Sequence, residues 1–292
     1  MIAAGELAQG LADEIAVAFI ASCRDEIDAP KPGNVHRFAA GHGIEAEEFL
    51  VSASAAAPAV AASGVPVGRR ILAAVSATFA AVGKNTNLGI LLLCAPLAAA
   101  AERRHGGLQA NLALVLRDLG RSDADDAFAA IRLARPAGLG EAPRHDVHGA
   151  AQAGLREIMQ EAAGRDRIAL QYATVFDDIF VTGLAALARA RALRLAPPWT
   201  TVSVYLAFLA AFPDTHLVRK CGSAAAAEVQ DRGRRMRARF EQEGADCFAE
   251  LLALDGELKA LGRNPGTSAD LTVATLFADR LGNILLHHRN DG

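Results

Sequence analysis

The stretch that decides the fold is LGILLLCAPLAAAA, residues 88–101, which is the longest apolar run in the chain. It consists mainly of leucine and alanine, and both residues favour a helix. The run is too short to span a bilayer comfortably. It therefore predicts a helix that is buried on all sides within a larger helical protein.

The sequence on both sides continues this helical pattern. Apolar residues recur every three to four positions, at Ile71, Val75, Phe79 and Val82 before the run and at Leu108, Leu112, Val115 and Leu119 after it. Residues 200–206, TTVSVYL, come closest to a strand, but they continue without a break into AFLAA, so we expect a helix. We predict an all-α fold in which residues 1–292 form a single compact multi-helix domain.

Glycine, proline and capping residues mark where the expected helices begin and end. We expect helices over about 5–28, from 45, from 67, over 88–102, from 107, over 123–134, 147–163, 165–195 with a break near 175–178, 199–211, 223–241, 246–261 and 267–287.

Composition and charge narrow the class of protein. The formal net charge is −3, whereas a nucleic-acid binder usually carries a basic excess, so nucleic acid is not an expected partner. The four cysteines are scattered, which indicates reduced thiols rather than a disulfide framework or a zinc site. The first twenty residues lack the basic region of a signal peptide. We expect a cytoplasmic protein without a membrane segment, and a homodimer is the assembly that we consider.

Four loops are richer in polar chemistry than a helix connection requires. The first is KPGNVHR, residues 31–37. Gly33 would let a ligand approach the backbone closely, and Lys31, beside Asn34, could meet an anion. A surface turn with solvated charges is the alternative interpretation.

The second loop is GKNTNLG, residues 83–89, at the start of the apolar helix. A helix N-terminus offers free N–H donors and a positive dipole end, so it holds phosphates well. Lys84 adds a point charge, and Asn85, Thr86 and Asn87 could cradle a phosphate. Plain helix capping is the alternative, and the spacing is not that of a Walker A loop.

The third loop is FPDTHLVRKCG, residues 212–222. Asp214 could bind a metal or act as a base, and Arg219 and Lys220 could meet phosphate. A helix cap followed by an exposed helix is the alternative interpretation.

The fourth loop is NPGTSAD, residues 264–270. A turn at Gly266 that leads into Thr267 and Ser268 at a helix start makes a good anion cradle. Asp270 would then point toward anything bound there, including a metal ion on a phosphate. A capping pair of Thr267 and Asp270 is the alternative.

Asp177 and Asp178 form an acidic pair among apolar residues, where burying a carboxylate is costly. Magnesium binding would explain the pair, and one acid turned in with the other in solvent is the alternative. His145, Asp146 and His148 could contribute to a transition-metal site, but no third ligand is obvious, so ordinary loop histidines are preferred.

Together these loops resemble the triphosphoribosyl-dephospho-CoA synthase family. The matching segments are PKPGNV (30–35), NTNLG (85–89), FPDT (212–215) with Arg219-Lys220, and NPGTSADL (264–271), in the family's order and separation from about residue 21 to residue 285. The resemblance implies an all-helical transferase. Its reaction moves the triphosphoribosyl group of ATP to the 2′-hydroxyl of 3′-dephospho-CoA, and adenine leaves.

The chain departs from the family pattern at two places. A Thr-His-Lys-Gly-like stretch is usual where this chain has TNLG (86–89), and Pro-Gly-Leu-Val is favoured where it has PGNV (32–35). This variant resembles a branch found with methanopterin-type one-carbon metabolism. A related ribosyl or nucleotidyl transfer in one-carbon cofactor synthesis therefore stays open as an alternative.

Breaking the bond between adenine and ribose builds positive charge on the sugar. We expect a carboxylate near that sugar, and Mg²⁺ with cations and helix N-termini around the triphosphate. Asp214 and Asp270 are the candidate catalytic acids, and Asp177, Asp178 and Asp270 are the candidate metal ligands. The candidate nucleotide-binding residues are Lys31, Gly33, Asn34, Lys84, Asn85, Thr86, Asn87, Arg219, Lys220, Gly266, Thr267 and Ser268.

Two further classes of function fit the same loops. One is a non-catalytic nucleotide-binding or scaffolding protein, although acids beside cations would be of little use to it. The other is a magnesium-dependent N-glycosidase, which would transfer to water and need no acceptor.

Overall fold

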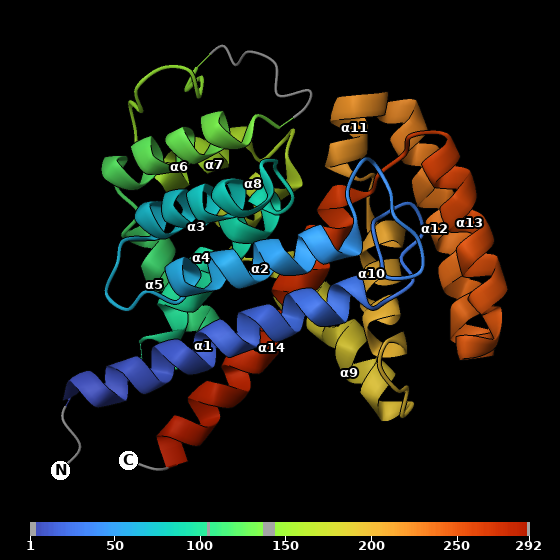
Figure 1. The fold of residues 1–292 in the computed structure, drawn as a ribbon, viewed down its shortest axis with the longest axis horizontal. Coiled ribbons are helices and arrows are strands. Elements are labelled where there is room, and N and C mark those ends of the chain that lie inside the picture. Colours follow the sequence, from blue (N-terminus) through green and yellow to red (C-terminus); the bar gives the residue numbers. More distant parts are fainter. Residues whose placement is uncertain (1–3, 104–105, 137–143, 291–292) are drawn as a thin grey trace.

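The computed structural model describes residues 4–103, 106–136 and 144–290, and helices account for most of them (Figure 1). In chain order the helices are α1 (Ala4–Ile27), α2 (Ala46–Val60), α3 (Val67–Val82), α4 (Leu88–Ala101), α5 (Leu108–Arg117), α6 (Arg121–Ala134), α7 (Leu155–Ala162), α8 (Arg167–Thr174), the π-helical turn η1 (Asp178–Gly183), α9 (Leu184–Ala192), α10 (Trp199–Ala211), α11 (Thr215–Cys221), α12 (Ser223–Glu243), the 3₁₀ turn η2 (Gly244–Cys247), α13 (Phe248–Ala260) and α14 (Gly266–Asn290). Extended pairing within the described ranges is limited to two isolated bridges in residues 36–44. The predicted all-α fold is confirmed.

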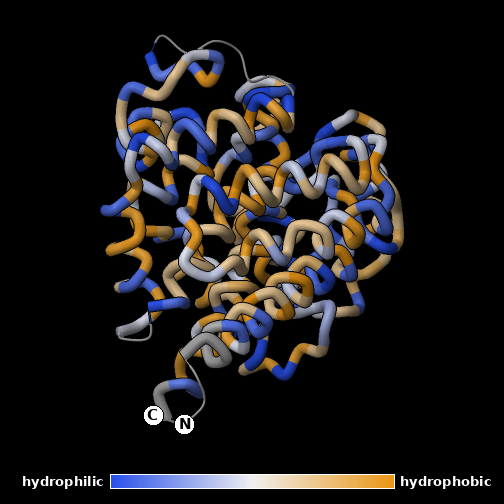
Figure 2. The backbone as a smooth tube through the Cα atoms, turned by 60° about the vertical axis from the view of Figure 1, so that its left-hand side comes forward, coloured by the Kyte–Doolittle hydropathy of each residue, from blue (hydrophilic) through white to orange (hydrophobic). Residues whose placement is uncertain are grey.

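Helix α4 occupies the middle of the larger hydrophobic cluster, as its sequence predicts. Its side chains are buried on all sides, and Leu91, Leu93, Cys94 and Ala95 are fully enclosed. Helices α3, α5 and α14 pack directly against it. Helix α14 begins beside α11, passes through the middle of the molecule and ends beside α1, against which it packs (Figure 1). The two ends of the chain accordingly lie on the same side of the molecule (Figure 2).

A second hydrophobic cluster lies among α10, α11, α12 and α13. Helix α10 faces both clusters, because Val204 and Phe208 belong to the first and Tyr205 and Leu209 to the second. Helix α14 likewise contributes to both. These two helices join the clusters, and one domain over residues 1–292 stays our prediction.

The long helix expected over 165–195 is broken where the sequence suggested. Val175 and Phe176 both have positive φ angles, of 55° and 61°. The chain turns there by 94° between α8 and the helical segment that follows. Burial of the Phe176 ring stabilises this turn, since the ring is completely enclosed in the core.

One expected helix starts later than its sequence suggested. Helix α7 begins at Leu155 rather than near residue 147. Aspartate side chains bind the backbone of the preceding segment, because Asp146 accepts from the His148 amide at 2.8 Å and Asp125 accepts from the Ala151 amide at 2.8 Å. Such side-chain bonds compete with helix formation.

No single helix in the described ranges has the length and apolarity needed to cross a membrane. Two strongly bent pairs, α8 with residues 178–192 and α10 with α11, meet that test by length and composition when their members are combined.

Candidate active site

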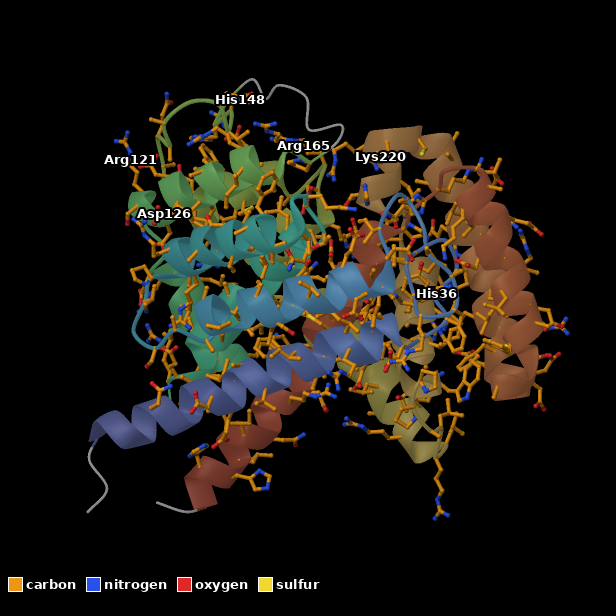
Figure 3. All side chains as sticks on the ribbon, in the orientation of Figure 1. His36, Arg121, Asp126, His148, Arg165 and Lys220 are labelled. Carbon is orange, nitrogen blue, oxygen red and sulfur yellow. The ribbon has the colours of Figure 1, made fainter. Side chains whose placement is uncertain are left out.

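A cavity of about 890 Å³ separates α11 and the first turn of α14 from α6, α7 and α8. All four polar loops reach it, and the residues that line it are Asn34 and Val35 from the first loop, residues 83–89 from the second, His216, Val218, Arg219 and Lys220 from the third, and Asn264, Gly266, Thr267, Ala269 and Asp270 from the fourth. Its volume lies at the upper end of the range for small-molecule sites. Arg165 and Lys220 lie on facing sides of the opening, before α8 and at the end of α11 (Figure 3).

The cavity lining combines polar and apolar side chains. The polar side is formed by the helix starts of α4 and α14 and by α11. Helices α3, α6, α7 and α8 contribute the apolar side chains of Phe79, Phe128, Ile131, Leu155, Ile158, Met159 and Ile168, and the segments between α6 and α8 add the polar residues Arg135, His145, Asp146, Arg165 and Asp166. This mixed lining suits a ligand that has both a charged group and a flat or apolar group.

Asp270 lies where the N-terminal turns of α4 and α14 meet. A Cβ atom at Gly89 would overlap the Asp270 carboxylate, so the acid rests directly on the backbone of α4. The carboxylate lines the cavity and is partly open to it. No described residue donates a hydrogen bond to it, so its charge is left for a ligand.

The surroundings of Asp270 disfavour its ionised form. Burial raises the pKa of its carboxyl well above its usual range, and the charges of Asp214, Glu26 and Asp166 act in the same direction. Arg219 opposes them. A cation bound beside the carboxylate would relieve this cost.

Asp214 has a different environment, because protein donors surround it. One carboxylate oxygen accepts from the amides of His216 and Leu217, at 3.0 and 3.2 Å, and thereby caps α11. The other accepts from the amide and the hydroxyl of Ser268, at 2.8 and 2.9 Å. Burial raises the pKa of Asp214, and these hydrogen bonds oppose the rise. Asp214 does not line the cavity, so its position is that of a brace between α11 and α14.

His216 and Thr267 connect the same two helices on the cavity side. The His216 ring presses against Gly266, where a Cβ would overlap Nδ1. The His216 amide donates to the Thr267 hydroxyl at 3.1 Å. Burial lowers the pKa of His216 to about 4, with Arg219, Lys220 and His42 contributing. The imidazole is therefore neutral at physiological pH.

The cations of the site lie at its rim. Arg219 pairs with Asp166 at 3.3 Å, and Asp166 also caps α8. Lys84 donates to the Gly43 carbonyl at 2.9 Å and pairs with Glu48 at 2.7 Å. Lys220 is exposed and makes no ion pair with a described residue.

The polar residues before α4 line the cavity and also bind the protein. Asn85 accepts from the Leu88 amide at 3.2 Å, which is the capping role considered above. The Thr86 hydroxyl donates to Ser52, and the Asn87 amide donates to Thr78. These contacts fix the turn that leads to Gly89.

Lys31 and Gly33 lie outside the cavity. Lys31 is fully buried, forms an ion pair with Glu26 at 2.8 Å and donates to the Val35 carbonyl at 2.6 Å. In this position Lys31 cannot reach a phosphate in the cavity, contrary to our hypothesis for it. Gly33 has a φ of 83° and lies against Pro265, so its conformation serves packing between the first and fourth loops.

Asn34 links these two loops at the cavity wall. Its side-chain amide donates to Asn264 Oδ1 at 2.8 Å. Asp255 of α13 holds the loop from behind by accepting from the Gly33 amide at 2.9 Å and pairing with Lys259 at 2.9 Å. Asp255 belongs to no recognisable motif, so the sequence does not indicate that it binds the first loop.

The acidic pair at 177–178 also lies outside the cavity. Asp178 accepts two hydrogen bonds from Arg167, both at 2.7 Å, and one from Gln171. Asp177 is exposed. This arrangement matches the alternative of one acid in and one out, and gives no support to a magnesium site at the pair. Across the described residues, no group of three or more His, Cys, Asp and Glu side chains could hold a metal by itself.

The cavity also contains residues that the sequence did not single out. His42, Arg165 and Asp166 all line it. His42 follows Gly41 in the segment between the first loop and α2, and its Nε2 lies 2.8 Å from the Gly33 carbonyl. Asp166 resembles any other helix cap in the sequence, so nothing there distinguishes it.

A helical fold with two helix starts, cations and a half-buried carboxylate around one cavity is typical of an enzyme that handles phosphorylated substrates. Comparison with known proteins specifies the class. The family model described as ATP:dephospho-CoA triphosphoribosyl transferase matches residues 12–288, so the chain belongs to this family and is a transferase. ATP is a substrate of the family.

Two relatives agree with this assignment. A protein of Stutzerimonas stutzeri strain A1501 described as a 2-(5″-triphosphoribosyl)-3′-dephosphocoenzyme-A synthase is 28% identical over 302 residues, covering 94% of this chain and 93% of the relative. A crystal structure from Archaeoglobus fulgidus, described as a triphosphoribosyl-dephospho-CoA synthase, has a TM-score of 0.62 and 26% identity. It covers 79% of this chain and 97% of its own.

Proposed function

We propose that the cavity binds ATP with its triphosphate at the polar side, and transfers the triphosphoribosyl group to the 2′-hydroxyl of 3′-dephospho-CoA. The observation that carries this proposal is the meeting of the α4 and α14 helix starts at Asp270. Helix N-termini favour phosphate, and a carboxylate favours the positive charge that develops on the sugar. The apolar side chains of α6, α7 and α8 in the cavity wall offer a surface for the adenine that leaves.

Each residue of the polar side has a role in this proposal. Lys84, Arg219 and Lys220 neutralise the triphosphate, and the first turns of α4 and α14, with Asn85, Thr86, Asn87, Gly266 and Thr267, bind it. Asn34 borders the same space. Ser268 acts indirectly, because its amide and hydroxyl hold Asp214, which in turn fixes the start of α11.

Asp270 is the residue that we propose for Mg²⁺. Its carboxylate has no donor among the described residues and burial disfavours its charge, so a divalent cation fits there. Magnesium commonly uses one or two carboxylates together with substrate phosphates, which agrees with a single acid here. When bound, the ion would neutralise charge on the triphosphate.

Adenine release tests the proposal. We would incubate the protein with ATP and Mg²⁺, with and without 3′-dephospho-CoA, and quantify adenine by chromatography. Release that requires 3′-dephospho-CoA is expected, and chelation of Mg²⁺ should abolish it. Equal release without an acceptor would indicate an N-glycosidase. An absence of release under both conditions would contradict the proposal and leave the one-carbon cofactor alternative, or a binding role, to be tested with those acceptors.

We also propose a cytoplasmic location, since both nucleotide substrates are intracellular metabolites in this reaction. The homodimer stays a prediction that a sedimentation measurement would test.

A further inference from the structure

His216 is a cavity residue whose ring has no hydrogen-bond partner among the described residues. Its backbone amide is bound by Asp214 and Thr267, which fixes the residue at the start of α11. The ring presses against Gly266, so its position over α14 is fixed as well. The side chain lines the cavity. Because the ring is fixed in position and its nitrogens make no hydrogen bond to a described residue, they can hydrogen-bond a ligand.

The position of His216 relative to Asp270 follows from helix geometry. The ring lies on Gly266, and Asp270 comes four residues later in the same helix. Residues four apart lie on one helix face, separated by roughly 6 Å along the axis. The imidazole and the carboxylate therefore border the same stretch of the cavity wall, about one turn apart. If the reacting sugar carbon is bound near Asp270, the acceptor hydroxyl that attacks it lies within reach of His216.

We propose that His216 is the general base that takes the proton of the acceptor hydroxyl; this inference rests on the function proposed above. The acceptor oxygen forms a bond to C1′ of the ribose, the bond from C1′ to N9 breaks, and its electron pair leaves with adenine. The hydroxyl proton passes to the imidazole. The leaving adenine takes up one proton from solvent and the imidazolium releases its proton to solvent, so His216 returns to neutral and the protons balance.

The surroundings of His216 keep its imidazole neutral, which is the form that can accept a proton. Burial is the main cause that lowers the pKa of His216, and the charges of Arg219 and Lys220 on α11 and of His42, between α1 and α2, act in the same direction. The acids nearby are Asp214, which binds the His216 amide, and Asp270 on α14. A weak base is sufficient, since the hydroxyl proton becomes strongly acidic once the oxygen bonds to a cationic sugar carbon. The negative triphosphate of a bound ATP would favour the imidazolium as it forms.

The test compares His216→Gln with His287→Gln. The glutamine introduced by the first substitution keeps a polar side chain but cannot take a proton, whereas His287 is an exposed histidine near the other end of α14. We expect His216→Gln to lower kcat by roughly 100-fold or more, with the KM for ATP changed by less than about threefold. The acid limb of the wild-type pH–rate profile should disappear in the residual activity. His287→Gln should behave as wild type.

A second variant separates chemistry from folding. His216→Ala leaves space for a small base, so added imidazole should restore part of its activity, which a purely structural role would not allow. An active wild type together with an unchanged kcat and pH profile in His216→Gln would overturn the inference and leave the proposed function intact. Loss of ATP binding by His216→Gln, or no rescue of a folded His216→Ala, would also overturn it. An inactive wild type would instead contradict the proposed function.

Discussion

The start of α14 contacts two carboxylates, Asp214 on its inner face and its own Asp270 on the face toward the cavity. The two carboxylates differ in their hydrogen bonding. On the inner face, Asp214 accepts four hydrogen bonds and uses both of its oxygens. On the cavity face, Asp270 accepts none from the described residues and rests on bare backbone at Gly89. Both acids are held by the same short segment of helix. The contrast indicates that Asp214 maintains the structure and that Asp270 is available to bind a ligand.

The largest expected effect is that of Asp270→Asn on activity. The variant cannot supply the negative charge that the developing sugar cation and Mg²⁺ require, so we expect kcat/KM to fall about 1000-fold or more. Adenine release at limiting and saturating ATP measures this loss. An activity within a few-fold of wild type would remove Asp270 from the site.

The same variant should gain stability, which sharpens the comparison. The folded protein holds a proton on Asp270 more tightly than the unfolded chain does, because burial raises its pKa. Stability therefore falls as the pH rises from about 4 toward that raised pKa. We expect Asp270→Asn to melt a few degrees above wild type at pH 7, and the difference to vanish near pH 4. Thermal unfolding without ligands, followed over that range, is the measurement.

The second largest effect is the loss of stability in Asp214→Asn. An asparagine offers one acceptor oxygen and turns an NH₂ group toward donors, so at least two of the four hydrogen bonds are lost within the interior. We expect a destabilisation of about 2–4 kcal/mol, measured by denaturant unfolding. Asp177→Asn, at an exposed acid, is the matched control and should leave stability unchanged. A variant Asp214→Asn as stable as wild type would contradict the structural role of Asp214 and remove its difference from Asp270.

The smallest effect is expected at the rim. Lys220→Gln removes an exposed charge that no described residue pairs with, so the melting temperature should not change. We expect the KM for ATP to rise about three- to tenfold, and this difference to shrink at high salt because rim charges are screened. Measuring the KM for ATP of both proteins at two salt concentrations tests this prediction. A variant with lower stability but normal ATP affinity would place Lys220 with the structural residues.

The sequence predicts the helices better than it predicts what their side chains do. The apolar run of α4, the break after α8 and the helix from Trp199 are confirmed because each depends on local pattern. The role of Lys31 differs from its prediction because a lysine beside Pro-Gly carries no sign of Glu26, which lies a few residues earlier and is buried with it.

Long-range partners explain the rest of the site. Asp214 bonds to Ser268 and Gly33 bonds to Asp255, and neither pairing leaves a pattern that can be read along the chain. The late start of α7 has the same origin, since Asp125 comes from another helix. Asp270 and His216 could be suspected from their loops, but only the contacts with Gly89 and Gly266 indicate how they face the cavity.

The dependence of the site on α14 has a consequence during biosynthesis. The nascent chain delivers α4 from the ribosome long before residues 266–270, and a domain generally folds as a unit. Until α14 docks, the floor of the cavity is missing and the buried face of α4 lacks one of its neighbours. Nucleotides can therefore stabilise only molecules that have passed this step, so ATP in the cell would favour finished protein over translation intermediates.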